Sequence, residues 1–377
     1  MDIFAIGTGH TKFGVLKDSS DDLIYYAAKE ALDNANIEFV DCDAVIVANF
    51  SSQFLKQSHT PARVASLFSK SEITRVESAC ASGALAVKEA IIYIKSGLYK
   101  TVLVVGFEKM STVTTDEASG ILMQAASKEE YDLGLTFPSL FALMARAHFE
   151  KYKSSERDLA KIAVKNHKNA FNNELAHFHK NISVDDVLNS KPIAPPIKLL
   201  DSSPISDGAA AIVLTSRKDK SRLKSKILSF GHVTEGIELT KRTELYKMPA
   251  VALAAKKAYE GAGILPRDIS FAEVHDCFTI AELIQIEELG FSRAGEGKKL
   301  ISNGSIEISG KIPINASGGL KAKGHPIGAT GVSQIVEVVR QFEGKAKKRQ
   351  LKNVKYGLTC NIGGIGSTAL VTILANP

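Results

Sequence analysis

Two cysteines and two histidines of this chain lie in short motifs that are rich in small residues, where a side chain can reach a substrate. The four motifs are Glu77-Ser-Ala-Cys80-Ala-Ser-Gly83, Phe271-Ala-Glu-Val-His275-Asp-Cys-Phe278, Gly318-Gly-Leu-Lys-Ala-Lys-Gly-His325-Pro-Ile-Gly-Ala-Thr-Gly331 and Lys355-Tyr-Gly-Leu-Thr-Cys360-Asn-Ile-Gly-Gly364. A thiolate is a strong nucleophile, and an imidazole carries protons near neutral pH. These residue types therefore indicate nucleophilic catalysis with acid and base assistance.

The local patterns place each of these side chains at the end of a strand or in a tight turn. We expect Cys80 between a strand at 74–76 and a helix at 84–94. A thiol that faces the first turn of a helix meets free N–H groups, which would lower its pKa from about 8.5 toward the reactive range. A buried structural cysteine is the alternative for this segment taken alone.

His325 lies in a glycine-rich turn that precedes an apolar helical pattern at 332–342. Gly324, Gly328 and Gly331 permit unusual backbone conformations, and Pro326 stiffens the exit from the turn. A phosphate-binding loop is the competing interpretation, but it requires a Gly-Lys-Ser/Thr ending and this segment has His-Pro instead.

Taken together and in this order, the four motifs resemble those of the thiolase superfamily. The likeness extends over nearly the whole chain, and it is strongest to the archaeal acetoacetyl-CoA thiolases and the sterol-carrier-protein type. Those carry His-Asp-Cys-Phe, as at 275–278, where the common thiolases carry Asn-Glu-Ala-Phe. The resemblance implies an α/β protein with the five-layered α-β-α-β-α thiolase-like fold, built from two pseudo-symmetric halves.

The resemblance also implies catalytic roles. Cys80 would attack a thioester and become acylated, and His325 would accept its proton. Cys360 would act as the second acid and base at the substrate α-carbon, and His275 would donate a hydrogen bond to a substrate oxygen. Substrate-binding positions would be the backbone N–H of Ile362, which together with that of Cys80 would form an oxyanion hole, and Phe278, Ser317 and Gly318.

Other polar residues near these motifs are expected to be bystanders. We interpret Cys277 as a packing residue, Cys42 as inert, and Lys321 and Lys323 as solvated loop lysines. The histidines of the segment between 116 and 200 are expected to be surface or cap residues; they are His148, His167, His177 and His179.

An internal repeat supports the two-half architecture. Residues 27–37 match residues 254–264 as amphipathic helices, and in both copies an apolar strand and later a glycine-rich turn follow. We expect an N-terminal half at 1–115 and 200–222, and a loop domain inserted at 116–199. The C-terminal half is expected at 223–377.

Composition limits the classes of function. The chain has 377 residues, 45% of them hydrophobic, enough for a large core in two domains. Four cysteines without a CxxC pair argue against a disulfide framework, and no apolar run is long enough for a membrane span. The net charge of +6 arises from 47 basic and 41 acidic residues spread along the chain, which indicates no nucleic-acid partner. We expect a cytoplasmic protein without a cofactor.

The sequence thus predicts an acetyl-CoA C-acetyltransferase that condenses two acetyl-CoA molecules or cleaves acetoacetyl-CoA with coenzyme A, feeding the mevalonate pathway. The resemblance implies a homodimer or homotetramer, with 3-hydroxy-3-methylglutaryl-CoA synthase and a small zinc-ribbon/OB-fold protein as further partners. Three alternatives stay open: a 3-ketoacyl-CoA thiolase for longer or branched chains, a non-catalytic acyl-CoA-binding subunit, and a metal site of Cys80, His275, His325 and Cys360.

Overall fold

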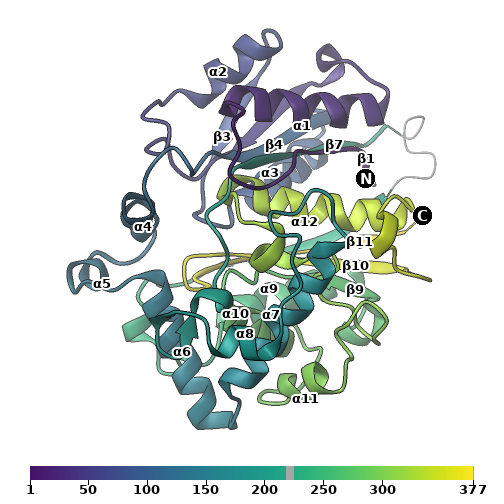
Figure 1. Cartoon of the computed structure of the whole chain (residues 1–377). Helices are drawn as coiled ribbons and strands as arrows, with labels where there is room; N and C mark the ends of the chain where they lie inside the picture. Colours follow the sequence, from purple (N-terminus) through teal and green to yellow (C-terminus); the bar gives the residue numbers. More distant parts are fainter. Residues whose placement is uncertain (218–224, 377) are drawn as a thin grey trace.

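The computed structural model describes residues 1–217 and 225–376, and it arranges them in five layers (Figure 1). Helices and strands alternate as layers from one outer face to the other, which confirms the α/β fold predicted from the sequence. The outer layers are α1 (Ser20–Ala35) with α2 (Thr60–Leu67), and α9 (Pro249–Ala262) with α10 (Thr279–Glu288). The central layer is α3 (Ser82–Lys95) with α12 (Ile327–Phe342).

Nine strands of the described residues form one mixed sheet that folds around the central helices, and β5 (Pro192–Ala194) and β6 (Ile197–Lys198) form a separate two-stranded sheet. The order of the nine-stranded sheet is β3 (Ile73–Val76), β2 (Ala44–Ala48), β4 (Thr101–Glu108), β7 (Gly208–Thr215), β1 (Ile3–His10), β8 (Ser225–Thr234), β11 (Thr368–Ala375), β10 (Tyr356–Gly363) and β9 (Phe271–Glu273). The two halves are joined where Ile3–Ala5 of β1 pair with β8. Every residue of β2 and β4 is buried, as expected for strands that are covered by helices on both faces.

The helices of the internal repeat, α1 and α9, pack against the sheet in the same way in the two halves. In the first half, a Cβ atom on Gly9 would lie 1.9 Å from the carbonyl oxygen of Ala27 on α1. In the second half, a Cβ atom on Gly231 would lie 1.8 Å from the carbonyl oxygen of Ala254 on α9. Ala27 and Ala254 are equivalent positions of the repeat. In each half a strand glycine lets the helix backbone at that position come close, since a side chain on the glycine would collide with it.

The two central helices touch through glycine at their N-terminal ends. A Cβ atom on Gly83 would lie 2.7 Å from the backbone nitrogen of Gly331, and one on Gly331 would lie 2.2 Å from that of Ala84. Backbone contact at this point brings the start of α3 next to the start of α12. It therefore places Cys80, just before α3, beside His325, just before α12.

The segment between β4 and β7 packs mainly against the C-terminal half. It contains α4 (Thr115–Met123), α5 (Lys128–Asp132), α6 (Phe137–Tyr152), α7 (Glu156–Phe171), α8 (Val184–Leu188), β5 (Pro192–Ala194) and β6 (Ile197–Lys198). α6 and α7, of 16 residues each, are the longest helices of this segment. α7 contacts α10, α11 (Gly297–Ser302) and the short π-helix η6 (Gly319–Lys323). The predicted domain boundary at 222/223 lies outside the described residues.

Two histidines of this segment are buried, contrary to the prediction of surface or cap residues. His148 is fully buried, and its Nδ1 lies 2.6 Å from Ser154 Oγ. His167 is 2% exposed, and its Nδ1 lies 2.8 Å from the carbonyl oxygen of Lys180. Both face inward from α6 and α7 because these helices are covered by the C-terminal half.

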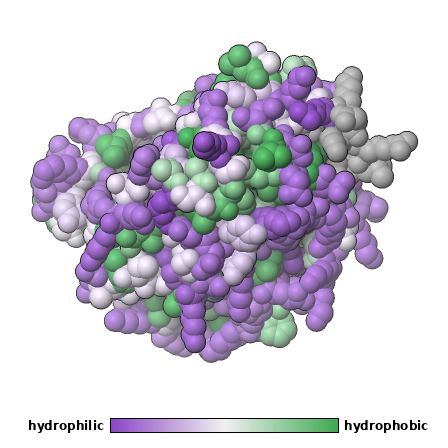
Figure 2. All heavy atoms as spheres, turned by 90° about the horizontal axis from the view of Figure 1, so that it is seen from above, coloured by the Kyte–Doolittle hydropathy of each residue, from purple (hydrophilic) through white to green (hydrophobic). Residues whose placement is uncertain are grey.

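The surface seen from above is mainly hydrophilic, with hydrophobic residues gathered in small patches (Figure 2). The basic segment at 345–355 is partly buried, since Arg349 is 4% exposed and forms two 2.9 Å contacts with Glu337. Lys347 pairs with Glu174 at 2.5 Å. None of the helices in residues 1–217 and 225–376 combines the length and the apolar character that crossing a membrane would need.

Candidate active site

Cys80 lies in a strained turn between β3 and α3, as the sequence predicted. Ala79 has a positive φ of 48°, which is uncommon for a residue with a side chain. The buried Ser82 hydroxyl holds this turn, because it accepts from the Ser78 N–H at 2.9 Å and donates to the Ala79 carbonyl at 2.6 Å. Backbone strain of this kind is typical of turns that present a nucleophile.

The environment of Cys80 corrects the prediction of a lowered thiol pKa. Burial raises the pKa of Cys80 to about 12, and the carboxylates of Glu108 and Glu77 act in the same direction. Hydrogen bonds from the backbone N–H groups of Gly364 and of Cys80 itself lower it only in part. The free protein therefore holds a neutral thiol, and a base must remove its proton during attack.

Two imidazoles lie within reach of this thiol. Cys80 Sγ and one nitrogen of each of His275 and His325 all lie within 4.8 Å of one another. The two rings are perpendicular, with centroids 4.9 Å apart. His275 follows β9, and His325 precedes α12. The structure thus brings together three of the four side chains that the sequence singled out.

Both imidazoles are neutral in the free protein. Burial lowers the pKa of His325 to about 3, and burial together with His325 lowers the pKa of His275 well below its ordinary value. The pKa of His325 therefore lies well below the near-neutral value of an ordinary imidazole. A neutral ring retains a lone pair, so it can still accept the proton of an attacking thiol.

Cys360 is not brought into this cluster. It was predicted after the end of a strand, but β10 continues to Gly363, so Cys360 lies within the strand. Its neighbour Asn361 donates to the Cys80 carbonyl at 3.1 Å, and side chains of adjacent strand residues point to opposite faces. Cys360 accordingly packs in the core on the α9 side, close enough to Tyr259 to raise the pKa of that phenol. The four-ligand metal site is therefore not assembled.

Cys277 is buried in the core cluster, in keeping with its interpretation as a packing residue, and it also lies close to Cys80. Burial raises the pKa of Cys277 well above its ordinary value, and the neighbouring Cys80 contributes to that shift. Its backbone carbonyl accepts from the Ser203 N–H at 2.9 Å, which fixes the start of α10 beside the site. The described residues thus place a second thiol near Cys80, but from the His-Asp-Cys-Phe motif.

Backbone donors surround the Cys80 thiol, and the role of Ile362 toward a substrate oxygen stays a prediction. The N–H groups of Gly364 and of Cys80 itself are directed at the Cys80 thiol. Gly364 has a positive φ of 61° in the turn between β10 and β11, where a side chain is disfavoured. Ile362 is fully buried in β10, so its side chain is accommodated in the core.

The other predicted substrate-binding residues are engaged in structural contacts. Phe278 caps α10, and its ring stacks on Phe141 with centroids 4.7 Å apart. Ser317 donates to the Glu273 carboxylate at 2.5 Å. Gly318 has a φ of 105°, and a Cβ atom there would lie 2.5 Å from that of Ala170.

The two lysines of the glycine-rich turn are buried rather than solvated. Lys321 is 1% exposed and Lys323 is 3% exposed. Lys321 Nζ lies 3.3 Å from Nε2 of His167, and burial lowers its pKa to about 8. The prediction of solvated loop lysines is wrong, because α7 and the segment that follows it cover this turn.

A buried carboxylate that sequence reasoning missed holds the turn before His325. Asp276 accepts from the backbone N–H groups of Leu320 at 2.6 Å and Lys321 at 3.2 Å, and from the Asn166 amide at 2.6 Å. A Cβ atom on Gly319 would lie 2.2 Å from an oxygen of Asp276. Its position in the same motif as His275 was the signal that could have drawn attention to it.

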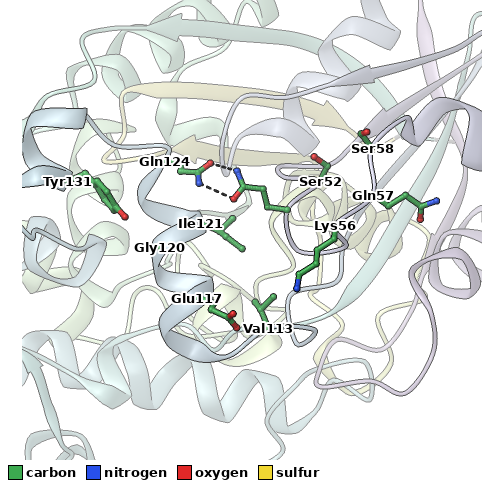
Figure 3. Close-up of a pocket in the computed structure, with 11 residues that line it drawn as sticks. Ser52, Lys56, Gln57, Ser58, Val113, Glu117, Gly120, Ile121, Gln124 and Tyr131 are labelled. Atoms are coloured by element: carbon green, nitrogen blue, oxygen red, sulfur yellow. Dashed lines mark hydrogen bonds between the residues drawn. The ribbon is translucent and has the colours of Figure 1, made fainter.

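A cavity of about 590 Å³ lies between residues 52–58 and 113–131, and Lys56, Glu117 and Ile121 are among the side chains that line it (Figure 3). Cys80 packs against a cluster that includes Phe54, Met110 and Ile121, and Ile121 also lines the cavity. Across the cavity, the amides of Gln53 and Gln124 donate to each other at 2.6 and 3.0 Å, shown as dashed lines in Figure 3.

Comparison with known proteins agrees with this geometry. The family model for the thiolase N-terminal domain matches residues 3–218, and the model described as thiolase C-terminal domain-like matches residues 231–376. The chain belongs to the thiolase superfamily. It is 42% identical over 381 residues to an acetyl-CoA acetyltransferase of Methanothermobacter thermautotrophicus, with 99% of each chain covered. It is 34% identical to human sterol carrier protein 2, covering 98% of this chain and 71% of the relative.

Solved structures share this fold. The Ltp2-ChsH2(DUF35) aldolase superposes with a TM-score of 0.86 at 26% identity, covering 100% of this chain and 98% of that one. Human mitochondrial 3-ketoacyl-CoA thiolase superposes with a TM-score of 0.76 at 16% identity, covering the same shares of the two chains, which shows the shared fold. The protein is therefore an acyltransferase of the thiolase family.

The Gly364 N–H provides a testable contribution to this thiolase site. Substituting Gly364→Ala forces a side chain onto a left-handed backbone, 3.3 Å from the Ala125 carbonyl oxygen, and should displace the donor. Loss of one such donor typically lowers kcat by about a hundredfold to a thousandfold. Steady-state assay of the purified variant measures this.

Gly366→Ala is the matched control, since Gly366 has a φ of 81° in the same turn but packs against the Met248 side chain. We expect a comparable loss of thermal stability with far less loss of activity. Equal activity losses in the two variants would show that Gly364 acts only through the stability of the turn.

Proposed function

We propose that the protein is an acetyl-CoA C-acetyltransferase, an acetoacetyl-CoA thiolase that works through an acyl-cysteine. The observation that carries this proposal is the cluster of Cys80 with His275 and His325 within 4.8 Å. The acetyl-CoA acetyltransferases of two methanogens, at 42% and 39% identity over nearly the whole chain, support acetyl-CoA as the substrate.

The first half-reaction is acyl transfer to sulfur. His325 accepts the Cys80 proton as Sγ attacks the thioester carbonyl of acetyl-CoA, and His275 and nearby backbone N–H groups bind the oxygen that becomes negative. The carbon–sulfur bond to coenzyme A then breaks, and His325 returns the proton to the leaving thiolate. The products are acetyl-Cys80 and free coenzyme A.

The second half-reaction forms the carbon–carbon bond. We assign the removal of the α-proton from the second acetyl-CoA to Cys277 rather than to Cys360, because Cys80 lies close enough to Cys277 to shift its pKa. Cys360 points to the opposite face of β10 from Asn361, which contacts Cys80. In this step Cys277 acts as a thiolate, after its thiol proton has passed to His325. The resulting carbanion attacks acetyl-Cys80, and Cys80 leaves as a thiolate that takes this proton from His325. Thiolysis of acetoacetyl-CoA runs through the same steps in reverse.

Acetylation of Cys80 tests the proposal directly. Incubation with acetyl-CoA followed by peptide mass spectrometry should show the acetyl group on Cys80, and acetoacetyl-CoA with coenzyme A should be consumed in steady state. Absence of both would leave the non-catalytic acyl-CoA-binding subunit as the better description.

We extend the proposal to the cellular setting. The reaction would supply acetoacetyl-CoA to the mevalonate pathway from a homodimer or homotetramer, with 3-hydroxy-3-methylglutaryl-CoA synthase and a small zinc-ribbon/OB-fold protein as partners. The solved aldolase complex with ChsH2(DUF35) supports a small partner. Co-purification from the native source followed by mass spectrometry tests the assembly.

The proposal also covers the domains. Residues 116–199 would form the loop domain over the substrate. The N-terminal half would be 1–115 with 200–222, and the C-terminal half would be 223–377.

The same neighbour makes an aldolase the second candidate function, since it is the solved structure with the TM-score of 0.86. Aldol cleavage forms no acyl-enzyme, so it would not need Cys80 as a nucleophile. Product analysis distinguishes the two: a thiolase consumes coenzyme A in each cleavage, and an aldolase does not.

Ile121 should limit the acyl chain length. It packs against the cluster around Cys80 and also lines the 590 Å³ cavity, so Ile121→Ala should open a path between them. Two further methylenes buried there are worth about 0.8 kcal/mol each, or roughly a tenfold gain. We expect the kcat/KM ratio of 3-oxohexanoyl-CoA over acetoacetyl-CoA to rise by about that factor.

Leu122→Ala is the matched control, because Leu122 packs against the same cluster but does not line the cavity. An equal rise in both variants would indicate general loosening of the cluster. A wild-type preference for the longer substrate would instead favour the 3-ketoacyl-CoA thiolase alternative.

A further inference from the structure

We propose that Asn361 and Thr330 hold the two imidazoles beside Cys80 in opposite tautomers, so that His325 presents a lone pair and His275 presents an N–H at Nε2. The inference rests on the proposed function for its consequence, but the tautomers themselves are a property of the free protein. It makes Asn361 and Thr330 positioning residues, which act through the histidines.

The tautomer of His275 follows from the Asn361 amide. Asn361 Nδ2 lies 3.1 Å from the carbonyl oxygen of Cys80 and 2.8 Å from Nδ1 of His275. A carbonyl oxygen can only accept, so the nitrogen of the amide must face it. On the other side, Asn361 Oδ1 accepts from the Ala84 N–H at 3.4 Å, which agrees with this orientation.

With Asn361 donating, Nδ1 of His275 must be the acceptor. The neutral ring carries one proton, which then lies on Nε2. Burial keeps the ring neutral by lowering its pKa, so no second proton is present. His275 is therefore a hydrogen-bond donor toward the reacting atoms and has no lone pair to offer there.

The tautomer of His325 follows from the Thr330 hydroxyl. Thr330 Oγ1 lies 2.9 Å from the carbonyl oxygen of Pro326, four residues earlier on α12, and 2.7 Å from Nδ1 of His325. Helical threonines commonly donate to the carbonyl four residues back. The hydroxyl has one proton, so after donating to Pro326 it accepts from Nδ1–H of His325.

With the proton on Nδ1, Nε2 of His325 carries the lone pair. The ring is neutral because burial lowers its pKa to about 3, and it can accept the Cys80 proton at Nε2. The two imidazoles, whose centroids are 4.9 Å apart, thus differ in function although both are buried and neutral. His325 is the base and His275 is the donor.

This arrangement also bears on metal binding at the three-residue cluster. A metal ion needs a lone pair from each histidine, and the ligand nitrogen is selected by what the other nitrogen binds. At His275 the available Nε2 carries the proton. The tautomer fixed by Asn361 therefore favours a substrate oxygen over a metal ion as the partner of His275.

Nitrogen-15 NMR of the protein with labelled histidine reads the tautomers without any substrate. Long-range proton–nitrogen spectra distinguish a protonated from an unprotonated ring nitrogen, and His275→Asn and His325→Asn identify the two rings by loss of signals. We expect Nε2–H at His275 and Nδ1–H at His325. The opposite tautomer at either ring overturns the proposal.

Substituting Asn361 and Thr330 tests whether these two residues determine the tautomers of His275 and His325. Asn361→Asp replaces the donor with an acceptor, and the His275 proton should move to Nδ1 while kcat falls about a hundredfold or more, as for a lost oxyanion donor. Thr330→Val should leave His325 in mixed tautomers, and Thr330→Ser should restore both the Nδ1–H signal and activity. A purely structural role would lower stability and leave the tautomers unchanged, which would overturn the proposal.

This test is separable from the proposed function. If acetyl-CoA fails to acetylate Cys80 in the wild-type protein while the tautomers are as expected, the proposed function is wrong and the tautomer assignment stands. If acetylation occurs but the NMR signals show the same tautomer at both rings, the proposed function stands and the tautomer assignment is wrong.

Discussion

Cys80→Ala should abolish acyl transfer, with a fall in turnover on the order of 10⁴-fold or more, since no other group replaces a covalent nucleophile. The variant should show no acetylated cysteine after incubation with acetyl-CoA. The fold should survive, because Cys80 is only partly buried in the turn and the Ser82 hydrogen bonds that hold this turn remain. Steady-state thiolysis, peptide mass spectrometry and thermal unfolding measure these outcomes.

Cys42→Ala is the matched control. Cys42 is buried after η1 (Phe39–Asp41) in the first half, packs with α1 and β2, and its pKa is raised to about 12 by burial, as for Cys80. It therefore resembles Cys80 in ionisation but lies outside the cluster of imidazoles. Full activity in Cys80→Ala, or equal losses in the two variants, would remove Cys80 from the role of nucleophile.

The parts of the site that follow from local chain geometry could be predicted from the sequence. The turn at Cys80 and the helix after His325 are encoded within about ten residues each, by small residues, glycine and apolar periodicity. The contact between Gly83 and Gly331 then brings the two turns together. The ordered motifs identified the same two positions through the family resemblance.

The side-chain directions along β10 could not be predicted in this way. Whether Cys360 or Asn361 faces Cys80 depends on where the strand ends, and a shift of one residue exchanges the two faces of a strand. The sequence was interpreted as a turn after Cys360, whereas pairing with β11 continues through Gly363 with Thr368. That extension turns Cys360 toward α9 and Asn361 toward Cys80.

The burial of polar side chains also could not be predicted from the sequence. Lys321 and Lys323 follow glycines in a turn, which resembles a solvated loop, but η6 lies beneath α7. Burial also desolvates His325 and lowers its pKa to about 3. Such shifts depend on segments that are more than a hundred residues away in sequence, so the local pattern carries no sign of them.

Cys277→Ala and Cys360→Ala should differ strongly in their effect on activity. Cys277→Ala should lower condensation and thiolysis by about 10²- to 10⁴-fold, the usual contribution of a positioned acid or base, and should still permit acetylation of Cys80. Cys360→Ala should retain activity within a few-fold, because the side chain packs in the core against the α9 side of the sheet. A modest loss of stability, about 1 kcal/mol, is expected from the removed sulfur.

The split between acetylation and turnover makes this comparison decisive. A variant that lost Cys80 reactivity would fail at the first half-reaction, whereas loss of the α-carbon base blocks only the second, so acetyl-enzyme accumulates when acetyl-CoA is supplied alone. Accumulation in Cys277→Ala assigns the base to the His-Asp-Cys-Phe motif. Accumulation in Cys360→Ala, with Cys277→Ala fully active, would return the role to β10 and require that strand to rotate its side chains relative to the arrangement in which Asn361 contacts Cys80.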